Sequence, residues 1–231
     1  HRVVADLVFD KIRELGELSD VLVGLGWALA TKVGIPLDKN SRTGKFLIRI
    51  MDHDFLINTV GMATARDFYA RLENLLSSDY HYWLQRGSLE LEVGDSRKAE
   101  NFLGSARSLG AGDFRVDTAY AYMLMKKACE APKDLHAEEF LNKGITDLEA
   151  IIETTGHFNG YAFHVLGSQG LAWAHRAIPE REKRRRFLGK LCDVVKQGVK
   201  LHPDNDELTK LSKDLEKEVL LTTTVDKSTL A

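Results

Sequence analysis

A recurring pattern of small and large residues constrains the fold of this chain more than any other feature. It is clearest in residues 82–109, where Trp83 and Gly87 stand four residues apart and Gly94 interrupts the helical periodicity. Three further residues follow at positions i, i+4 and i+7: Ala99, Leu103 and Ala106. Small residues let two helices approach closely, and large residues fill the space between them. The stretch therefore predicts two antiparallel helices joined near Gly94.

The second half of this pattern recurs along the chain. Thirty-four residues earlier, the same positions are occupied by Ala65, Tyr69 and Leu72. Later copies of the triplet are Ala137, Leu141 and Gly144, and then Leu191, Val195 and Gly198. A period of this length is typical of stacked helix pairs, and no window shows the alternation of a β-strand. We expect an all-α chain, an αα-superhelix of helix pairs preceded by two or three packing helices.

Three segments are expected from this pattern. Residues 1–60 form an N-terminal helical segment, with helices predicted at 2–15, at 19–34 with Ser19 as its N-cap, and at about 44–58. Residues 61–220 form the repeat array. Residues 221–231 lack helical periodicity and are expected to form an extended tail.

Composition narrows the classes of function. The chain has 231 residues, of which 32 are basic and 34 acidic, so its formal net charge is −2. This balance argues against general nucleic-acid or membrane-surface binding. The two cysteines form no disulfide framework or metal motif, and no apolar run approaches the ~20 residues of a membrane helix. We expect a cytoplasmic chain, and because it begins at His1 without a signal-like segment, a fragment of a longer protein.

No residue set in the sequence converges on catalysis. The segment 43–45, Thr-Gly-Lys, lacks the flanking residues of a phosphate loop, and a helix start is expected there. The three consecutive residues 52–54, Asp-His-Asp, would point about 100° apart on a helix and cannot meet at one metal ion. The histidines His157, His164 and His175 are scattered. We therefore expect no enzyme activity, metal or cofactor in this chain.

Two local features remain open between structural and binding roles. Residues 182–186 give five consecutive charges, four of them basic, which form either a solvated helix face or a contact for an acidic partner. Tyr80 and His81 flank the entry of the helix that carries Trp83. They either close the junction to the preceding repeat or contribute to a recognition surface.

The pattern around Trp83 resembles the tetratricopeptide repeat, whose consensus places an aromatic residue, a Gly, a turn Gly and A-x3-F-x2-A at the corresponding positions. The consensus closing Pro is replaced by Ala111. The resemblance implies a curved array whose concave face is lined by the first helix of each pair and binds a peptide or protein. By this register, the residues facing the groove are His81, Leu84, Ser88, Arg115, Thr118, Tyr122, Lys126, Tyr161, His164 and Ser168. Tyr122 and Tyr161 could instead pack between repeats.

The register also argues against chaperone tails that end in a carboxylate, a well-known ligand class of this family. Tetratricopeptide domains that bind such tails hold them with a Lys/Asn clamp, and Leu84 and Ser88 stand where its first Lys and Asn would be.

The phrases HRVVADLVFD, YHYWLQRGSLELEVGD and FHVLGSQGLAWAHR resemble the helical C-terminal half of bacterial STAND-type NTPases of antiviral defence. This narrower resemblance spans roughly residues 1–200. It implies a sensor domain that recognises a phage protein and takes part in self-association. The alternative is a tetratricopeptide adaptor that scaffolds other proteins.

Overall fold

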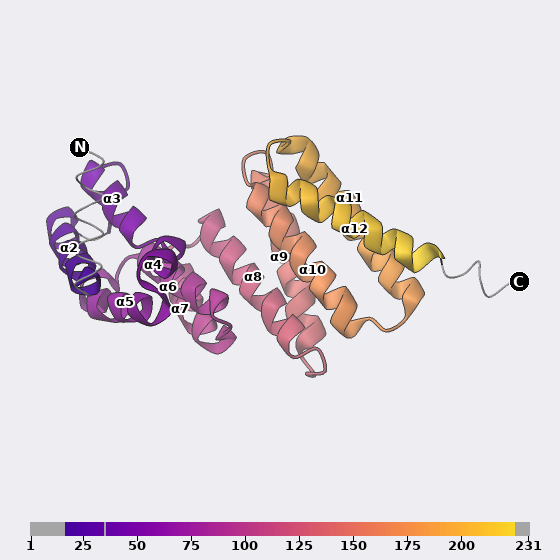
Figure 1. Cartoon of the computed structure of the whole chain (residues 1–231), viewed down its shortest axis with the longest axis horizontal. Helices are drawn as coiled ribbons and strands as arrows, with labels where there is room; N and C mark the ends of the chain where they lie inside the picture. The colour runs from indigo at the N-terminus through magenta and orange to yellow at the C-terminus, as the bar shows by residue number, and fades with distance from the viewer. Residues whose placement is uncertain (1–16, 35, 225–231) are drawn as a thin grey trace, which may run out of the picture. The chain divides into compact units, whose positions relative to one another are not determined.

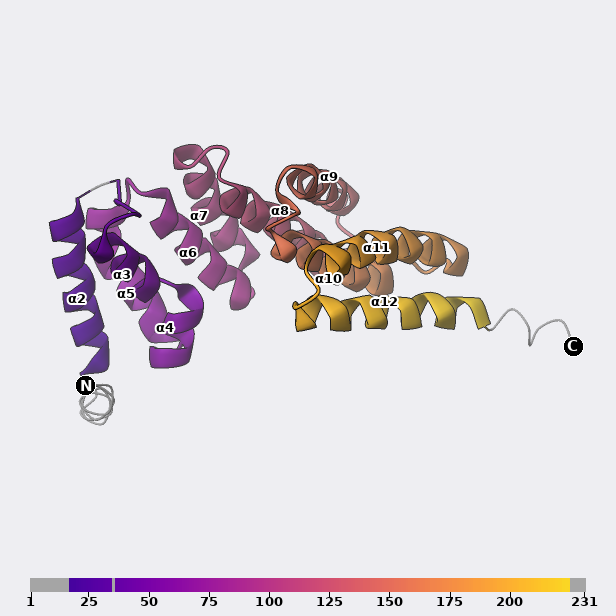
Figure 2. The ribbon, with the colours of Figure 1, turned by 90° about the horizontal axis from the view of Figure 1, so that it is seen from above.

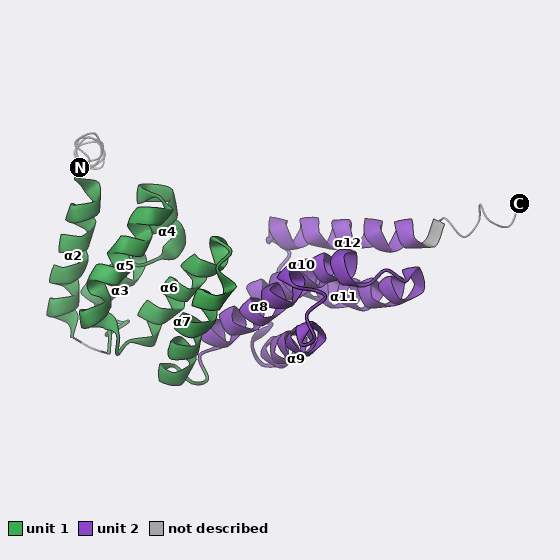
Figure 3. Ribbon diagram, turned by 90° about the horizontal axis from the view of Figure 1, so that it is seen from below, with its two compact units in different colours: residues 1–112 green, residues 113–231 purple. Residues whose placement is uncertain are grey.

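The computed structural model describes residues 17–34 and 36–224, with side chains described up to residue 222. Every regular element in these ranges is an α-helix, which confirms the all-α prediction (Figure 1). The chain divides into two compact units at Gly112 and Asp113 (Figure 3). Each unit has its own buried apolar cluster. The superhelical course of the whole array stays a prediction.

Unit 1 contains six described helices (Figure 2), and polar N-caps and glycines set several of their ends. They are α2 (Leu18–Val33), α3 (Arg42–Ile50), α4 (His53–Val60), α5 (Met62–Leu76), α6 (Tyr80–Glu92) and α7 (Ser96–Leu109). The side chains of Ser41, Asp52 and Asp79 accept backbone N–H groups at the starts of α3, α4 and α6. Such caps satisfy donors that have no partner within the helix. Gly34 and Gly61 end α2 and α4 with positive φ angles, a conformation that costs glycine little.

The core of unit 1 gathers around α5. Phe68, Tyr69 and Leu72 are at most 1% exposed and belong to an apolar cluster that draws on helices α2 to α6. The hydroxyl of Tyr82 donates to the carbonyl of Tyr69 at 2.8 Å, and that of Tyr69 donates to the carbonyl of Met51. These bonds satisfy the polar ends of two large buried rings and link α5 to α6 and to the end of α3.

The helix pair α6 and α7 packs through the residues that the sequence pattern singled out. Gly87 is buried in α6, and a Cβ atom placed there would lie 2.6 Å from Cγ of Leu103 in α7. Leu103 and its neighbours Ala99 and Ala106 are fully buried. The absence of a side chain at Gly87 is therefore what lets the two backbones approach. Trp83 is one of the large residues that the pattern places between the two helices, but it is only half-buried, and its ring stacks on that of Phe102 with the centroids 5.7 Å apart.

Unit 2 repeats the same packing device in five helices. They are α8 (Phe114–Glu130), α9 (Ala137–Thr155), α10 (Gly160–Ala177), α11 (Arg181–Leu201) and α12 (Asp206–Thr224). A Cβ at Gly144 of α9 would meet Met125 of α8 at 2.5 Å, and one at Gly170 of α10 would meet Leu191 of α11 at 2.5 Å. Successive helices thus form close antiparallel pairs, and α12 covers α10 and α11.

Several predicted boundaries differ from the structure. Ser19 lies inside α2, whose N-cap is Glu17. The single helix expected over residues 44–58 is two helices, because Asp52 caps a new helix after Met51. Residues 221–224 belong to α12 rather than to an extended tail, and the helix expected at 2–15 lies outside the described residues. Residue 61 lies inside unit 1, where α5 packs against α2 and α4, and the start of the repeat array there stays a prediction.

We predict opposite effects for two glycine substitutions in the α6–α7 pair. Gly87→Ala should lower the free energy of unfolding by about 1 kcal/mol, because overpacking costs ~1–3 kcal/mol and exceeds the gain in helix propensity. Gly104→Ala in α7 is the matched control, since nothing lies within 4 Å of its added Cβ. It should raise stability by about 0.5–1 kcal/mol. Urea denaturation followed by circular dichroism measures both, and equal stabilisation by the two variants would contradict the packing described here.

We also predict a contribution of Tyr82 to alkaline unfolding. Burial raises the pKa of Tyr82 to about 12, whereas an unfolded tyrosine has a pKa of about 10. Between these pH values the unfolded chain loses a proton that the folded chain keeps, so stability falls as pH rises. From pH ~9 to ~11 the parent chain should lose about 1 kcal/mol more than Tyr82→Phe. Urea midpoints at the two pH values test this, and parallel losses in both proteins would contradict it.

Candidate functional site

In unit 1, the residues expected to face a groove are largely covered. His81 and Leu84 lie three residues apart on α6, and they are only 4% and 6% exposed. Ser88 is half-buried. The backbone N–H of His81 donates to the Asp79 side chain at 2.8 Å, so His81 lies in the capped first turn of α6. The prediction that His81 and Leu84 project into an open groove is therefore wrong for this structure.

Two further residues expected to face the groove, both in α8, form hydrogen bonds at the start of that helix. Thr118 is 2% exposed, and its hydroxyl donates to the carbonyl of Phe114 at 2.6 Å, so its expected exposure is also wrong. Arg115 is exposed, but its guanidinium forms a two-pronged contact with Asp113 at 2.9 and 2.6 Å. The hydrogen bond that Arg115 donates to the Asp113 carboxylate raises the pKa of Arg115 above its ordinary value. Both side chains thus contribute to the N-terminus of α8.

Helices α8 and α10 are neighbours that run in parallel, as the first helices of two successive pairs should. At their starts, the rings of Phe114 and Phe158 lie 5.3 Å apart. At their ends, the thiol of Cys129 donates to the carbonyl of Gln169 at 3.4 Å, and Arg176 donates to the carbonyl of Cys129 at 2.9 Å. This arrangement places the remaining expected groove residues on two adjacent helices.

The aromatic residues of these two helices differ in environment. Tyr122 is half-buried against the core of unit 2, with the Lys126 ammonium 5.8 Å from its ring. Tyr161 is 53% exposed and stacks on His164 with a centroid distance of 6.4 Å. Ser168, two turns beyond Tyr161, donates to the carbonyl of Val165 at 3.3 Å. Tyr122 therefore has a packing role, whereas Tyr161 and His164 form a surface pair that a partner could reach.

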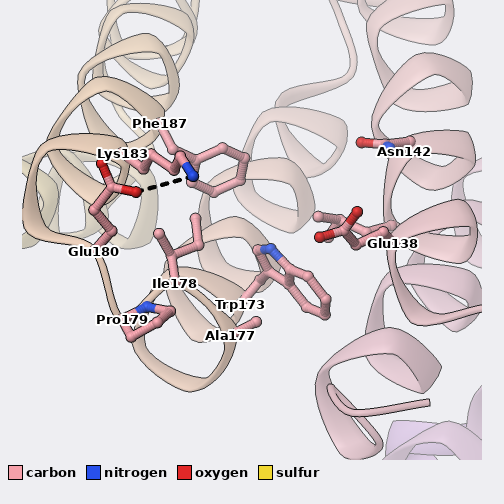
Figure 4. Close-up of a pocket in the computed structure, with 10 residues that line it drawn as sticks. Glu138, Asn142, Trp173, Ala177, Ile178, Pro179, Glu180, Lys183 and Phe187 are labelled. Atoms are coloured by element: carbon pink, nitrogen blue, oxygen red, sulfur yellow. Dashed lines mark ion pairs between the residues drawn. The ribbon is translucent and has the colours of Figure 1, made fainter. Parts of the chain in front are cut away.

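A cavity that the sequence did not predict lies elsewhere in unit 2. It has a volume of about 410 Å³ and opens between α9, the end of α10 and the start of α11 (Figure 4). Its walls are Glu138, Leu141, Asn142, Trp173, Ala177, Ile178, Pro179, Glu180, Lys183 and Phe187. We refer to this feature as the α9–α11 cavity.

The walls of the α9–α11 cavity combine apolar and polar groups. Trp173 is 4% exposed and forms part of the apolar core. Glu138 and Asn142 stand one helical turn apart on α9, and Figure 4 shows both on the wall opposite Lys183. The ammonium of Lys183 pairs with Glu180 at 2.9 Å. That hydrogen bond is the main cause that raises the pKa of Lys183, and the charge of Glu138 adds to it.

The cavity was missed because its residues come from three helices and belong to no local motif. Trp173 lies ten residues after the aromatic position Phe163, outside the repeat pattern. The sequence did contain one indication of the cavity. The polar residues Glu138 and Asn142 lie on either side of the core residue Leu141, so they stand at the edge of the apolar face of their helix. Pro179 also marked a bend beside Trp173.

The other candidate sites have structural explanations. Three cations in the basic segment have local partners: Arg184 donates to the carbonyl of Ile178, Arg185 pairs with Glu182, and Lys183 pairs with Glu180. Asp52 is a helix cap. Within the described ranges, no group of three potential metal ligands gathers. No helix there has the length and apolar character needed to cross a membrane.

Comparison with known proteins adds no assignment. The sequence matches no protein-family model and no curated protein.

We predict that two tyrosines of unit 2 differ in their contribution to stability. Tyr122→Ala should lower the free energy of unfolding by about 1–3 kcal/mol, because it removes a ring that packs on the core. Tyr161→Ala should change it by less than about 0.5 kcal/mol, as is usual for an exposed residue. Thermal and urea unfolding of the two variants test this, and a larger loss for Tyr161→Ala would assign its ring to packing.

Proposed function

We propose that this chain is a protein-interaction module of tetratricopeptide type that recognises a partner protein through unit 2. The observation that carries the proposal is the exposed ring of Tyr161, stacked on the half-buried His164 on α10, beside a parallel first helix, α8. Tyrosine offers a large rigid contact surface and a hydroxyl that both donates and accepts, which suits protein interfaces. Neighbouring first helices in helical repeats create an extended surface for such contacts.

The partner in this proposal is a phage protein, and the chain is the sensor part of a larger bacterial STAND-type NTPase. This assignment rests on the resemblance of residues 1–200 to that family. Its nucleotide-binding and effector functions would reside in other parts of the protein. The resemblance of Trp83, Gly87 and the repeated triplets to the tetratricopeptide consensus supports the interaction role without requiring a defence role.

An adaptor that scaffolds a host complex is the second candidate. It is favoured by the same Tyr161–His164 pair on α10, because an interaction surface of this kind is compatible with any protein partner. The two candidates differ in what the partner is and in whether binding triggers nucleotide hydrolysis.

The deciding experiment is a phage challenge of bacteria that express the full-length protein. When Tyr161 and His164 are both replaced by Ala, we expect protection to be lost. The plating efficiency of the phage should then rise at least tenfold above that on cells with the parent protein. Lys190→Ala is the matched control, since Lys190 is exposed on α11 away from this pair. Purified variants should have the melting temperature of the parent.

Three outcomes would count against the proposal in different ways. Full protection by the double variant would place recognition elsewhere. Protection lost together with a large fall in melting temperature would assign the pair to packing. Absence of protection by the parent against every phage, together with co-purification of a host protein that the double variant loses, would favour the adaptor.

A further inference from the structure

The α9–α11 cavity is lined by a nearly buried indole ring whose N–H has no acceptor among the described residues. Trp173 is 4% exposed, and its indole Nε1–H donates to no atom in the described parts of the chain. Figure 4 shows the indole nitrogen on the edge of the ring that faces the middle of the cavity. Because this nitrogen atom is accessible from the cavity, water or a ligand can supply the acceptor that an indole N–H normally has. The cavity therefore offers this donor to whatever enters it.

The cavity has room for a side chain as well as a polar contact. Its volume of about 410 Å³ falls in the range of ligand pockets, ~300–1,000 Å³. Leu141, Ile178 and Phe187 contribute apolar surface to it. An aliphatic or aromatic side chain of a ligand would remove this surface from water, which favours binding by about 25 cal/mol per Å².

The rim of the cavity favours a cation and a peptide group. Glu180 and Lys183 neutralise each other across 2.9 Å. Glu138 forms no ion pair with any described residue, so its carboxylate leaves the rim with a negative charge. Asn142, one turn along the same wall, carries both a donor and an acceptor. An amide side chain of this kind matches the N–H and C=O groups of an extended backbone.

We propose that the α9–α11 cavity binds an extended segment of a partner protein that carries an apolar side chain next to Lys or Arg. The apolar side chain enters beside Trp173, a backbone carbonyl accepts from the Trp173 indole, Asn142 bonds the adjacent peptide group, and the basic side chain pairs with Glu138. This inference rests on the proposed role in protein recognition, and it adds a second contact surface with a defined sequence preference.

The test uses short peptides and the 15N-labelled 231-residue chain. The probe is acetyl-Ala-Leu-Lys-Ala-amide, and the controls replace its Lys by Glu or its Leu by Ala. Indole N–H signals are recorded during titration, with that of Trp173 assigned through Trp173→Phe. The probe should shift the Trp173 signal and leave those of Trp27 and Trp83, which lie in unit 1, in place. Each control peptide should bind at least threefold more weakly.

Matched variants test whether the probe contacts Glu138 itself or is attracted by any carboxylate on α9. Glu138→Gln should weaken binding of the probe at least threefold and abolish the preference for Lys over Glu. Glu149→Gln, an exposed carboxylate on α9 outside the cavity, should bind like the parent. Asn142→Leu provides a second variant at an exposed position, so the result does not depend on whether Trp173→Phe folds.

The outcomes distinguish this inference from the proposed function. A shift of the Trp173 signal with the stated preferences supports the cavity. Shifts confined to other regions, or no difference between Glu138→Gln and Glu149→Gln, would overturn it and leave the Tyr161–His164 surface untouched. Signal changes that depend on protein concentration without peptide would identify a second copy of the chain as the occupant and overturn the partner-segment proposal.

Discussion

The structure depends on the close approach of paired helices at positions without a side chain. In unit 1, Gly87 admits Leu103; in unit 2, Gly144 admits Met125, and Gly170 admits Leu191. In each case an added Cβ would lie 2.5–2.6 Å from a side-chain carbon of the facing helix, far closer than packed atoms tolerate. Glycine costs a helix about 0.5–1 kcal/mol, and the close packing that these residues permit offsets that cost.

This pairing also explains why unit 2 contains a cavity. Helix α9 packs mainly on α8, and α11 packs on α10 and α12, so the two second helices meet no extensive surface of each other. The bend at Pro179 and the large ring of Trp173 lie where they separate. The close contacts that fix each pair thus leave an opening between pairs. Its apolar wall is core surface that no neighbouring helix covers.

Much of the fold could be predicted from the sequence, because it is carried by local patterns. The triplets at Ala65, Ala99, Ala137 and Leu191 do lie on buried faces, since their spacing reflects helix geometry directly. The break at Asp52 was missed because a cap within an apolar run depends on one side chain and on the contacts of the helices it separates. Exposure of His81, Leu84 and Thr118 was misjudged because a repeat register gives the direction of a side chain but not what covers it.

The candidate site shows the same limit more sharply. Tyr161 could be anticipated from its register, whereas the α9–α11 cavity joins residues 138 and 187, which no local pattern connects. Tyr69 and Tyr82 bury their hydroxyls with acceptors in the protein, whereas the indole N–H of Trp173 donates to no described residue and stays accessible from the cavity. Water can satisfy such an accessible donor in the free protein, and a polar group that opens into a largely apolar cavity is typical of a binding site. The indole of Trp173 is therefore a second indication of a binding site in unit 2, beside the exposed ring of Tyr161.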